Sequence, residues 1–274
     1  CREPAPPFYL FQRERRWNPQ QGRWMGWERK RGKLHELNRW LRGARDTSYA
    51  VFEGEQAWLD GVRYVITLDA DTILPREGAR RLAGTLAHPL NRAEIDRRTG
   101  RVVRGYGILQ PRTEITPRSA NYSHFSRIFA GDIGLDLYTQ AVSNVYQDLF
   151  GSGIYVGKGI YDIDAFERSL AGRVPENTLL SHDLFEGLYA RAGLVTDIAV
   201  YEDYPPSYLA YVRRLLRWTR GDWQLLPWLL PVTPGVGGRA RNVLGAIDLW
   251  KILDNLRRSL LPLSLLLILA AGGL

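Results

Sequence analysis

A short apolar strand that runs directly into an acidic pair is the feature that most constrains the fold of this chain. Residues 63–68 are largely apolar and β-favouring, and Asp69 and Asp71 follow them, one residue apart. Such a run is typical of an interior strand of a parallel sheet. Open α/β sheets bind ligands at the carboxyl ends of their strands, where this pair lies. Carboxylate oxygens suit Mg²⁺ or Mn²⁺, so the pattern indicates a phosphorylated ligand held through a divalent cation.

Strand and helix patterns alternate along most of the chain, which favours an α/β fold with a mostly parallel sheet flanked by helices. The expected strands cover residues 7–12, 63–68, 102–110 and 194–201. The expected helices cover residues 31–42, 77–88, 121–130, 163–171 and 183–192. A glycine-rich turn, GSGIYVGKG, occupies residues 151–159. We therefore predict that residues 1–204 form the sheet domain.

The character of the sequence changes after residue 204. Residues 205–256 combine tryptophan, arginine and leucine, which predicts amphipathic helices on a membrane surface, although ordinary packing on the sheet domain explains the pattern equally well. Residues 259–271 are apolar over about two-thirds of the roughly 20 residues that a bilayer span needs. We expect residues 257–274 to begin a transmembrane helix, with a buried helix as the alternative. Arg257 and Arg258 would keep the preceding domain in the cytoplasm.

Charge and cysteine content narrow the range of partners. The net charge is +8, so phosphorylated small molecules, anionic lipid and nucleic acid are all compatible with the composition. The aromatic residues form no nucleic-acid-binding signature, and we expect no nucleic-acid partner. Cys1 is the one cysteine, which excludes an intrachain disulfide framework and fits a reducing compartment.

Two further elements are ambiguous when each is taken alone. Asp183 begins a predicted helix, and its simplest interpretation is a helix N-cap. Arg217 and Trp218 are adjacent in another predicted helix, where such a pair is more often structural than catalytic. The sequence Asp-x-Asp-x-Thr after a strand also begins the active site of haloacid-dehalogenase-type phosphatases, in which Asp69 would be the nucleophile. The lysine that those enzymes need begins a helix, whereas Lys158 lies in the glycine-rich turn.

The order of the three elements resembles that of the processive family-2-like glycosyltransferases: Asp-x-Asp, then a lone Asp at a helix start, then Arg-Trp before apolar helices. The surrounding sequence resembles one subgroup, the cyclic β-1,2-glucan synthases of glycosyltransferase family 84. The segments that carry this resemblance are GWERKRGKLHELNRWLRG (26–43), VITLDADTILPR (65–76), GYGILQPRTEITPRSAN (105–121), VYQDLFGSGIYVGKGIYDIDAFER (145–168), VPENTLLSHDLFEG (174–187) and RWTRGDWQ (217–224).

The resemblance implies a GT-A-like, Rossmann-like domain, with the N-terminal part of that domain missing from this sequence. It implies an inverting glucosyltransferase that uses UDP-glucose to extend a β-1,2-linked glucan. The implied partners are UDP-glucose, a growing glucan acceptor, membrane lipid and the remainder of a larger multidomain synthase. The implied location is the bacterial inner membrane, with the catalytic domain in the cytoplasm. Another processive family-2 polysaccharide synthase is the alternative within this class.

The resemblance also assigns roles to single residues. Asp183 would be the catalytic base, and Asp71 with Asp69 would hold Mg²⁺ or Mn²⁺. The residues that would bind the donor are Lys30, Gly32, Asp69 and Arg217. The residues that would bind the acceptor are Trp218, Gly157 and Lys158. Arg214 stands where cellulose synthases carry glutamine, so an acceptor contact made by that glutamine does not carry over to this chain.

Overall fold

The computed structural model describes residues 8–130, 144–179 and 182–272. The chain divides into two compact units, Cys1–Val65 and Ile66–Leu274. The predicted domain boundaries after residues 204 and 256 stay predictions. Pro7, at the start of the first expected strand, and the last two residues of the expected membrane segment lie outside the described residues.

The first unit combines two small antiparallel sheets with one helix. Its strands and helices are β1 (Leu10–Arg13), β2 (Arg16–Asn18), β3 (Arg23–Met25), α1 (Arg29–Leu41), β4 (Tyr49–Glu53) and η1 (Gln56–Trp58). β1 pairs with β4, and β2 pairs with β3. The ring centre of Trp40 in α1 lies 5.0 Å from the ring centres of both Phe11 and Phe52. The helix therefore packs on the β1–β4 pair. The helix expected over residues 31–42 is confirmed.

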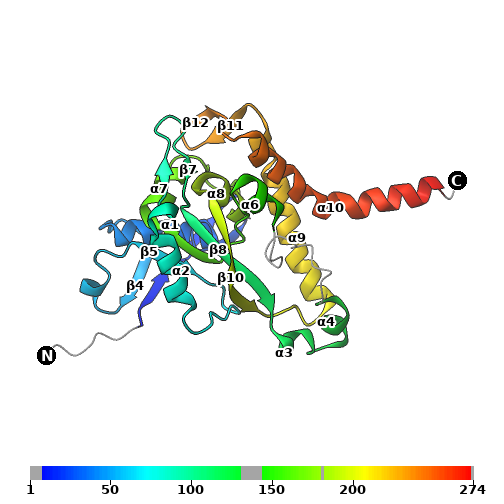
Figure 1. Cartoon of the computed structure of the whole chain (residues 1–274), viewed down its shortest axis with the longest axis horizontal. Helices are drawn as coiled ribbons and strands as arrows, with labels where there is room; N and C mark the ends of the chain where they lie inside the picture. The colour runs from blue at the N-terminus through cyan, green and yellow to red at the C-terminus, as the bar shows by residue number, and fades with distance from the viewer. Residues whose placement is uncertain (1–7, 131–143, 180–181, 273–274) are drawn as a thin grey trace. The chain divides into compact units, whose positions relative to one another are not determined.

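A four-stranded sheet has the strand order β10-β8-β9-β5, and three of its strands lie within the second unit while the unit boundary falls inside β5. The strands are β5 (Tyr64–Thr67), β8 (Ile108–Ile115), β9 (Gly159–Asp162) and β10 (Ala192–Glu202). β8 and β10 run parallel and side by side over the length of β8, while β8 and β9 are antiparallel (Figure 1). The α/β class is confirmed, and the longest strand pair is parallel as predicted.

Helices and hairpins surround this sheet. The remaining elements of the second unit are α2 (Gly78–Ala87), η2 (Pro89–Asn91), β6 (Glu94–Ile95), β7 (Val102–Arg104), α3 (Pro117–Ala120), α4 (His124–Phe129), α6 (Val145–Phe150), α7 (Ile163–Leu170), α8 (Asp183–Ala190), α9 (Tyr208–Gln224), η3 (Leu226–Leu229), β11 (Val232–Gly235), β12 (Gly238–Arg241) and α10 (Ala246–Gly272). The core includes Phe185 of α8, Trp228 of η3 and Ile252 of α10, each at most 1% exposed. Trp228 therefore packs in the core, as the alternative interpretation of residues 205–256 predicted.

Two expected elements have different bounds in the structure. The strand expected over residues 102–110 is divided into β7 and β8 because Gly105 adopts a φ of +62° between them. A Cβ at Gly105 would lie 2.0 Å from the Arg92 carbonyl oxygen, so the turn requires glycine. The helix expected over residues 121–130 is reduced to α4, because Ser123 and Ser126 form a capping box that fixes its start.

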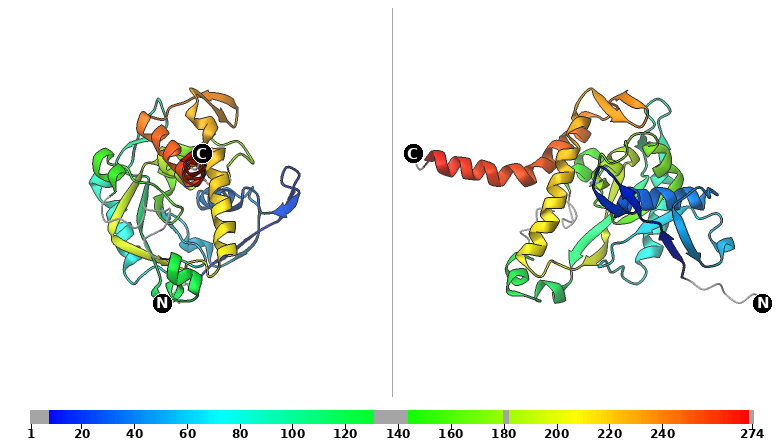
Figure 2. Two further views of the ribbon diagram at one scale, coloured as in Figure 1. Left: turned by 90° about the vertical axis from the view of Figure 1, so that its right-hand side faces the viewer. Right: turned by 180° about the vertical axis from the view of Figure 1, so that it is seen from behind.

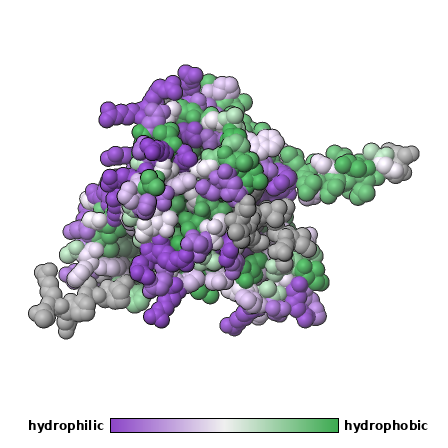
Figure 3. All heavy atoms as spheres, in the orientation of Figure 1, coloured by the Kyte–Doolittle hydropathy of each residue, from purple (hydrophilic) through white to green (hydrophobic). Residues whose placement is uncertain are grey.

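The second half of α10 extends away from the rest of the second unit (Figure 2). Its leucines are exposed, from 40% at Leu260 to 73% at Leu269, and they form a continuous apolar surface (Figure 3). The alternative of a buried terminal helix is therefore wrong for these residues. None of the described helices has both the length and the apolar content that a bilayer crossing requires.

Candidate functional site

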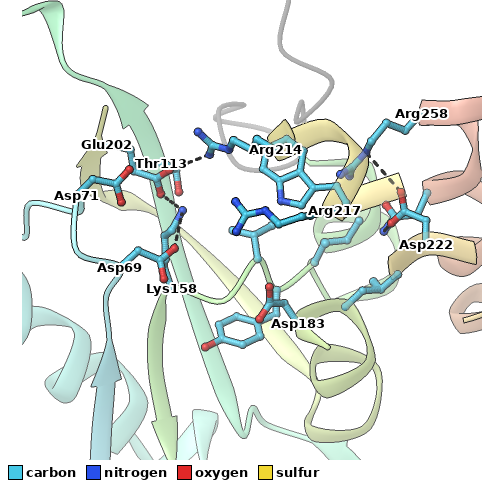
Figure 4. A pocket seen from close by; sticks show the side chains of 16 residues that line it. Asp69, Asp71, Thr113, Lys158, Asp183, Glu202, Arg214, Arg217, Asp222 and Arg258 are labelled. Atoms are coloured by element: carbon cyan, nitrogen blue, oxygen red, sulfur yellow. Dashed lines mark hydrogen bonds and ion pairs between the residues drawn. The ribbon is translucent and has the colours of Figure 1, made fainter. Parts of the chain in front are cut away.

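A pocket of about 400 Å³ lies in the second unit, between the carboxyl ends of β5 and β10 and the helices α9 and α10 (Figure 4). This volume lies in the range typical of small-molecule sites. The residues that line it come from seven separate segments of the chain. They are Asp69, Asp71, Thr113, Ile154, Tyr155, Val156, Lys158, Asp183, Leu184, Glu202, Arg214, Arg217, Trp218, Asp222, Asn255 and Arg258.

Most of the residues predicted to form a site meet in this pocket. Its lining contains six of them: Asp69, Asp71, Lys158, Asp183, Arg217 and Trp218. Gly157 is outside the lining but close to it, since a Cβ built on Gly157 would lie 2.7 Å from Asp183 Oδ1. Lys30 and Gly32 lie on α1 in the first unit, and their donor-binding roles stay predictions.

Gly32 has a packing role within its own unit. A Cβ at this position would lie 2.1 Å from the Trp27 carbonyl oxygen and 2.8 Å from the Trp27 ring. Since no side chain fits there, the local packing of α1 already requires glycine.

Asp183 is the first residue of α8, and it does not cap the helix. The N-cap position is His182, and no side-chain hydrogen bond caps this helix start. The N-cap interpretation of Asp183 is therefore wrong. Its Oδ1 is buried and accepts no hydrogen bond from the residues described, and His182 Nδ1 lies 3.5 Å from it. Leu180 and Ser181, which precede His182 in the predicted motif, lie outside the described residues.

Buried polar groups surround the Asp183 carboxylate. His182 Nδ1 lies 2.8 Å from Glu186 Oε1, one turn along α8, and both side chains are buried. The Tyr155 hydroxyl lies 2.9 Å from Thr67 Oγ1, at the end of β5. Burial raises the pKa of Tyr155 well above its usual value, and the carboxylates of Glu186 and Asp183 add to this effect. The base candidate thus lies beside a phenol that remains protonated.

The acidic pair and a lysine form one wall of the pocket. Asp71 is exposed, and the Asp69 side chain is 41% exposed with its Oδ2 3.4 Å from Lys158 Nζ. Lys158 Nζ also contacts Glu202 Oε1, and both of these side chains are less than 10% exposed. Two carboxylates that reach the pocket offer the oxygen ligands that Mg²⁺ and Mn²⁺ prefer, so this donor set fits such an ion.

A second group of potential metal ligands lies nearby. Ligand atoms of His182, Asp183 and Glu186 lie within 4.8 Å of one another. The hydrogen bond between His182 and Glu186 already occupies two of these groups. The acidic pair, where Asp71 is exposed, is therefore a better candidate to hold a divalent cation than this cluster.

Helix α9 carries the Arg-Trp pair to the opposite wall. The guanidinium carbons of Arg214 and Arg258 lie 4.6 Å and 4.9 Å from the centre of the Trp218 ring. Two cations therefore lie over the ring that was expected to bind the acceptor. Arg217 also lines the pocket, and within the described ranges no hydrogen bond or ion pair engages its guanidinium. Arg217 can thus bind an anion without breaking an existing contact.

Sequence reasoning missed three charged residues of the pocket. Glu202 ends β10 and is 4% exposed; its place after an apolar strand is the same signal that revealed Asp69 and Asp71. Arg258 was interpreted as a topology signal, but its Nε lies 3.7 Å from Asp222 Oδ2 in the pocket lining. No sequence signal distinguished the Asp222–Arg258 pair, because its two members lie on different helices.

Fold and pocket together define an α/β protein in which carboxylates and guanidinium groups face each other across one small-molecule site. No family model matches the chain. Over 260 residues the chain is 50% identical to the cyclic β-(1,2)-glucan synthase NdvB of Rhizobium meliloti (strain 1021). This similarity covers 94% of the chain and 9% of that protein. The predicted resemblance is confirmed: the chain is similar to one segment of a cyclic β-1,2-glucan synthase.

Proposed function

We propose that the pocket transfers a glucosyl unit from UDP-glucose to a growing β-1,2-glucan. The observation that carries this proposal is the convergence of Asp71, Asp183 and Arg217 on one pocket from three distant motifs. The 50% identity to a glucan synthase spans all three motifs. That relative is a glucan synthase, which supports glycosyl transfer in general, and the donor and linkage are our extension.

The chemistry is one inverting displacement. The acceptor hydroxyl oxygen attacks the anomeric carbon of glucose, the bond from that carbon to the diphosphate breaks, and UDP leaves with the bonding pair. Asp183 takes the hydroxyl proton, which suits a carboxylate with a buried oxygen that no described residue engages. Arg217 binds the diphosphate through its planar guanidinium, for which carboxylate or phosphate oxygens are the best partners.

The acidic pair completes the donor site. Asp71, with Asp69, would hold Mg²⁺ or Mn²⁺, and that ion would neutralise the charge that develops on the leaving diphosphate. Trp218 and Gly157 shape the acceptor side in this proposal. A sugar that stacks on Trp218 replaces or shares the contact with one of the two arginines over the ring.

The wider assembly is also part of the proposal. We place the chain in a GT-A-like catalytic domain of a larger synthase at the bacterial inner membrane, with the domain on the cytoplasmic side. The small share of the relative that the chain covers and the exposed leucines of α10 support a larger membrane-associated protein. A haloacid-dehalogenase-type phosphatase remains the rival class, and it requires a covalent phosphate on Asp69.

The test is a donor screen on the full-length protein in membranes. UDP-sugars are supplied with and without Mn²⁺, and product linkage is determined by methylation analysis. We expect transfer from UDP-glucose into a β-1,2-linked product, stimulated by Mn²⁺. Absence of transfer from every UDP-sugar, together with a trapped aspartyl phosphate on Asp69, would assign the pocket to the phosphatase class.

A further inference from the structure

Glu202 connects the two walls of the pocket. Its carboxylate lies at the end of β10 and is 4% exposed, so it has little contact with water. One oxygen contacts Lys158 Nζ, and the other lies 3.5 Å from Arg214 Nη2 (Figure 4). A buried carboxylate is stable only when cations or hydrogen bonds compensate for lost hydration. Lys158 and Arg214 are thus held by a single acid.

The contacts of Glu202 extend on both sides. Lys158 Nζ is also 3.4 Å from Asp69 Oδ2, next to the proposed metal ligands. Arg214 lies over the Trp218 ring. A chain of contacts therefore runs from Asp69 through Lys158, Glu202 and Arg214 to Trp218, and it joins the sheet edge to α9.

The charges around Glu202 suit a metal–diphosphate ligand. Asp69, Asp71 and Glu202 carry three negative charges, while Lys158 and Arg214 carry two positive ones. This small negative excess attracts a divalent cation. With the cation bound the excess becomes positive, which attracts the diphosphate. Lys158 Nζ, which contributes one of these positive charges, contacts both Glu202 and Asp69.

We propose that Glu202 is a positioning residue of the donor site, which holds Lys158 beside Asp69 as a diphosphate-binding cation and Arg214 over Trp218. This inference rests on the proposed function and deepens it. The inference assigns Lys158 to donor binding, whereas the resemblance implied acceptor binding. It also gives Arg214 a partner, since the arginine that replaces glutamine is matched by a buried acid.

Diphosphate binding to a Glu202→Gln variant separates positioning from simple charge. By charge alone, removal of an acid from an anion site strengthens anion binding. Positioning predicts the reverse, because the unanchored Lys158 leaves the diphosphate. We expect the variant to bind UDP and inorganic diphosphate about tenfold more weakly in the presence of Mn²⁺, as expected for one lost charge-assisted hydrogen bond.

The measurement is isothermal titration of the solubilised full-length protein, with the Lys158→Met variant and a double variant beside it. If Lys158 acts through Glu202, the double variant binds UDP no more weakly than Lys158→Met alone. Glu94→Gln is the matched control, since Glu94 forms an exposed ion pair with Arg104 outside the pocket, and its affinity should equal the wild-type value.

Two outcomes would overturn the inference: equal or tighter UDP binding by Glu202→Gln, or additive losses in the double variant. If Glu202→Gln lowers the melting temperature but leaves UDP affinity unchanged, Glu202 has only a structural role. The proposed function fails separately, since it requires transfer of glucose. A wild-type protein that binds UDP through Glu202 and Lys158 but transfers no sugar would refute the proposed function and leave this inference standing.

Discussion

Gly157 and Asp183 lie so close together that a single methyl group would not fit between them. A Cβ built on Gly157 would be 2.7 Å from Asp183 Oδ1 and 2.9 Å from Oδ2. Gly157 also adopts a φ of +86°, which side chains rarely tolerate. The glycine-rich turn thus leaves just enough space for the carboxylate of the proposed base.

Gly157→Ala should therefore displace the Asp183 carboxylate. We expect glucosyl transfer to fall by about 100-fold, since catalytic groups tolerate little misplacement, while UDP affinity stays near the wild-type value. Gly172→Ala is the matched control, because Gly172 has a φ of +71° and no atom within 4 Å of the added Cβ. Both variants cost about 1–2 kcal/mol of backbone strain, so equal loss of transfer in both would show that strain, and not contact with Asp183, is responsible.

Asp71→Asn should weaken binding of Mn²⁺. An amide replaces one of the two carboxylates in the acidic pair, and we expect at least about a tenfold loss of Mn²⁺ affinity by electron paramagnetic resonance titration. Asp197→Asn removes an exposed acid that pairs with Arg81 away from the pocket and serves as the control. Equal Mn²⁺ affinity in wild type and Asp71→Asn would place the cation elsewhere.

Arg217→Lys should lower donor affinity although the charge is kept. Lysine cannot offer the planar pair of donors that binds two phosphate oxygens, so the dissociation constant for UDP should rise by about tenfold. Arg213→Lys makes the same exchange at an exposed position on α9. A result in which both variants bind UDP like the wild type would remove Arg217 from the donor site.

Lys251 gives the second unit a distinct pH dependence. Its ammonium is 2% exposed and donates to Ser152 Oγ and to the carbonyl oxygens of Ser152 and Gly153, at 2.9–3.0 Å. Burial lowers the pKa of Lys251 to about 8 in the folded chain. An unfolded lysine titrates near pH 10.4, so the unfolded state binds more protons between about pH 8 and 10. Stability contributed by this group therefore rises with pH in that window.

Comparison with Lys251→Met isolates this effect. Between pH 8 and 10 the wild-type free energy of unfolding should rise relative to that of the variant, by at most about 1.4 kcal/mol per pH unit. Urea unfolding at pH 7 and pH 9.5 measures the difference. Lys33→Met replaces an exposed lysine and should show no such change. A constant difference between wild type and Lys251→Met would mean that Lys251 titrates normally.

The sequence predicts those parts of the fold and site that depend on local patterns. The β5 strand and the position of Asp69 and Asp71 follow from an apolar run and its end. The length of α1 follows from helical spacing and from Gly43, whose φ of +94° ends the helix. These signals lie within a few residues of the feature that they predict.

The remaining features depend on contacts between distant segments. Glu202 is paired with Lys158 and Arg214, and no local pattern specifies which cation a strand-end acid will meet. Arg258 of α10 pairs with Asp222 of α9, and the apolar sequence around Arg258 gives no sign of this contact. The requirement for glycine at position 105, between β7 and β8, depends on the carbonyl of Arg92.

The central claim is that Asp183 is the base of a sugar transfer in this pocket, and Asp183→Asn tests it most directly. Asparagine keeps the size of the side chain but cannot accept the proton. With radiolabelled UDP-glucose and the full-length protein in membranes, we predict that transfer falls by at least about 100-fold while UDP affinity is unchanged. Wild-type turnover by the Asp183→Asn variant would contradict the account.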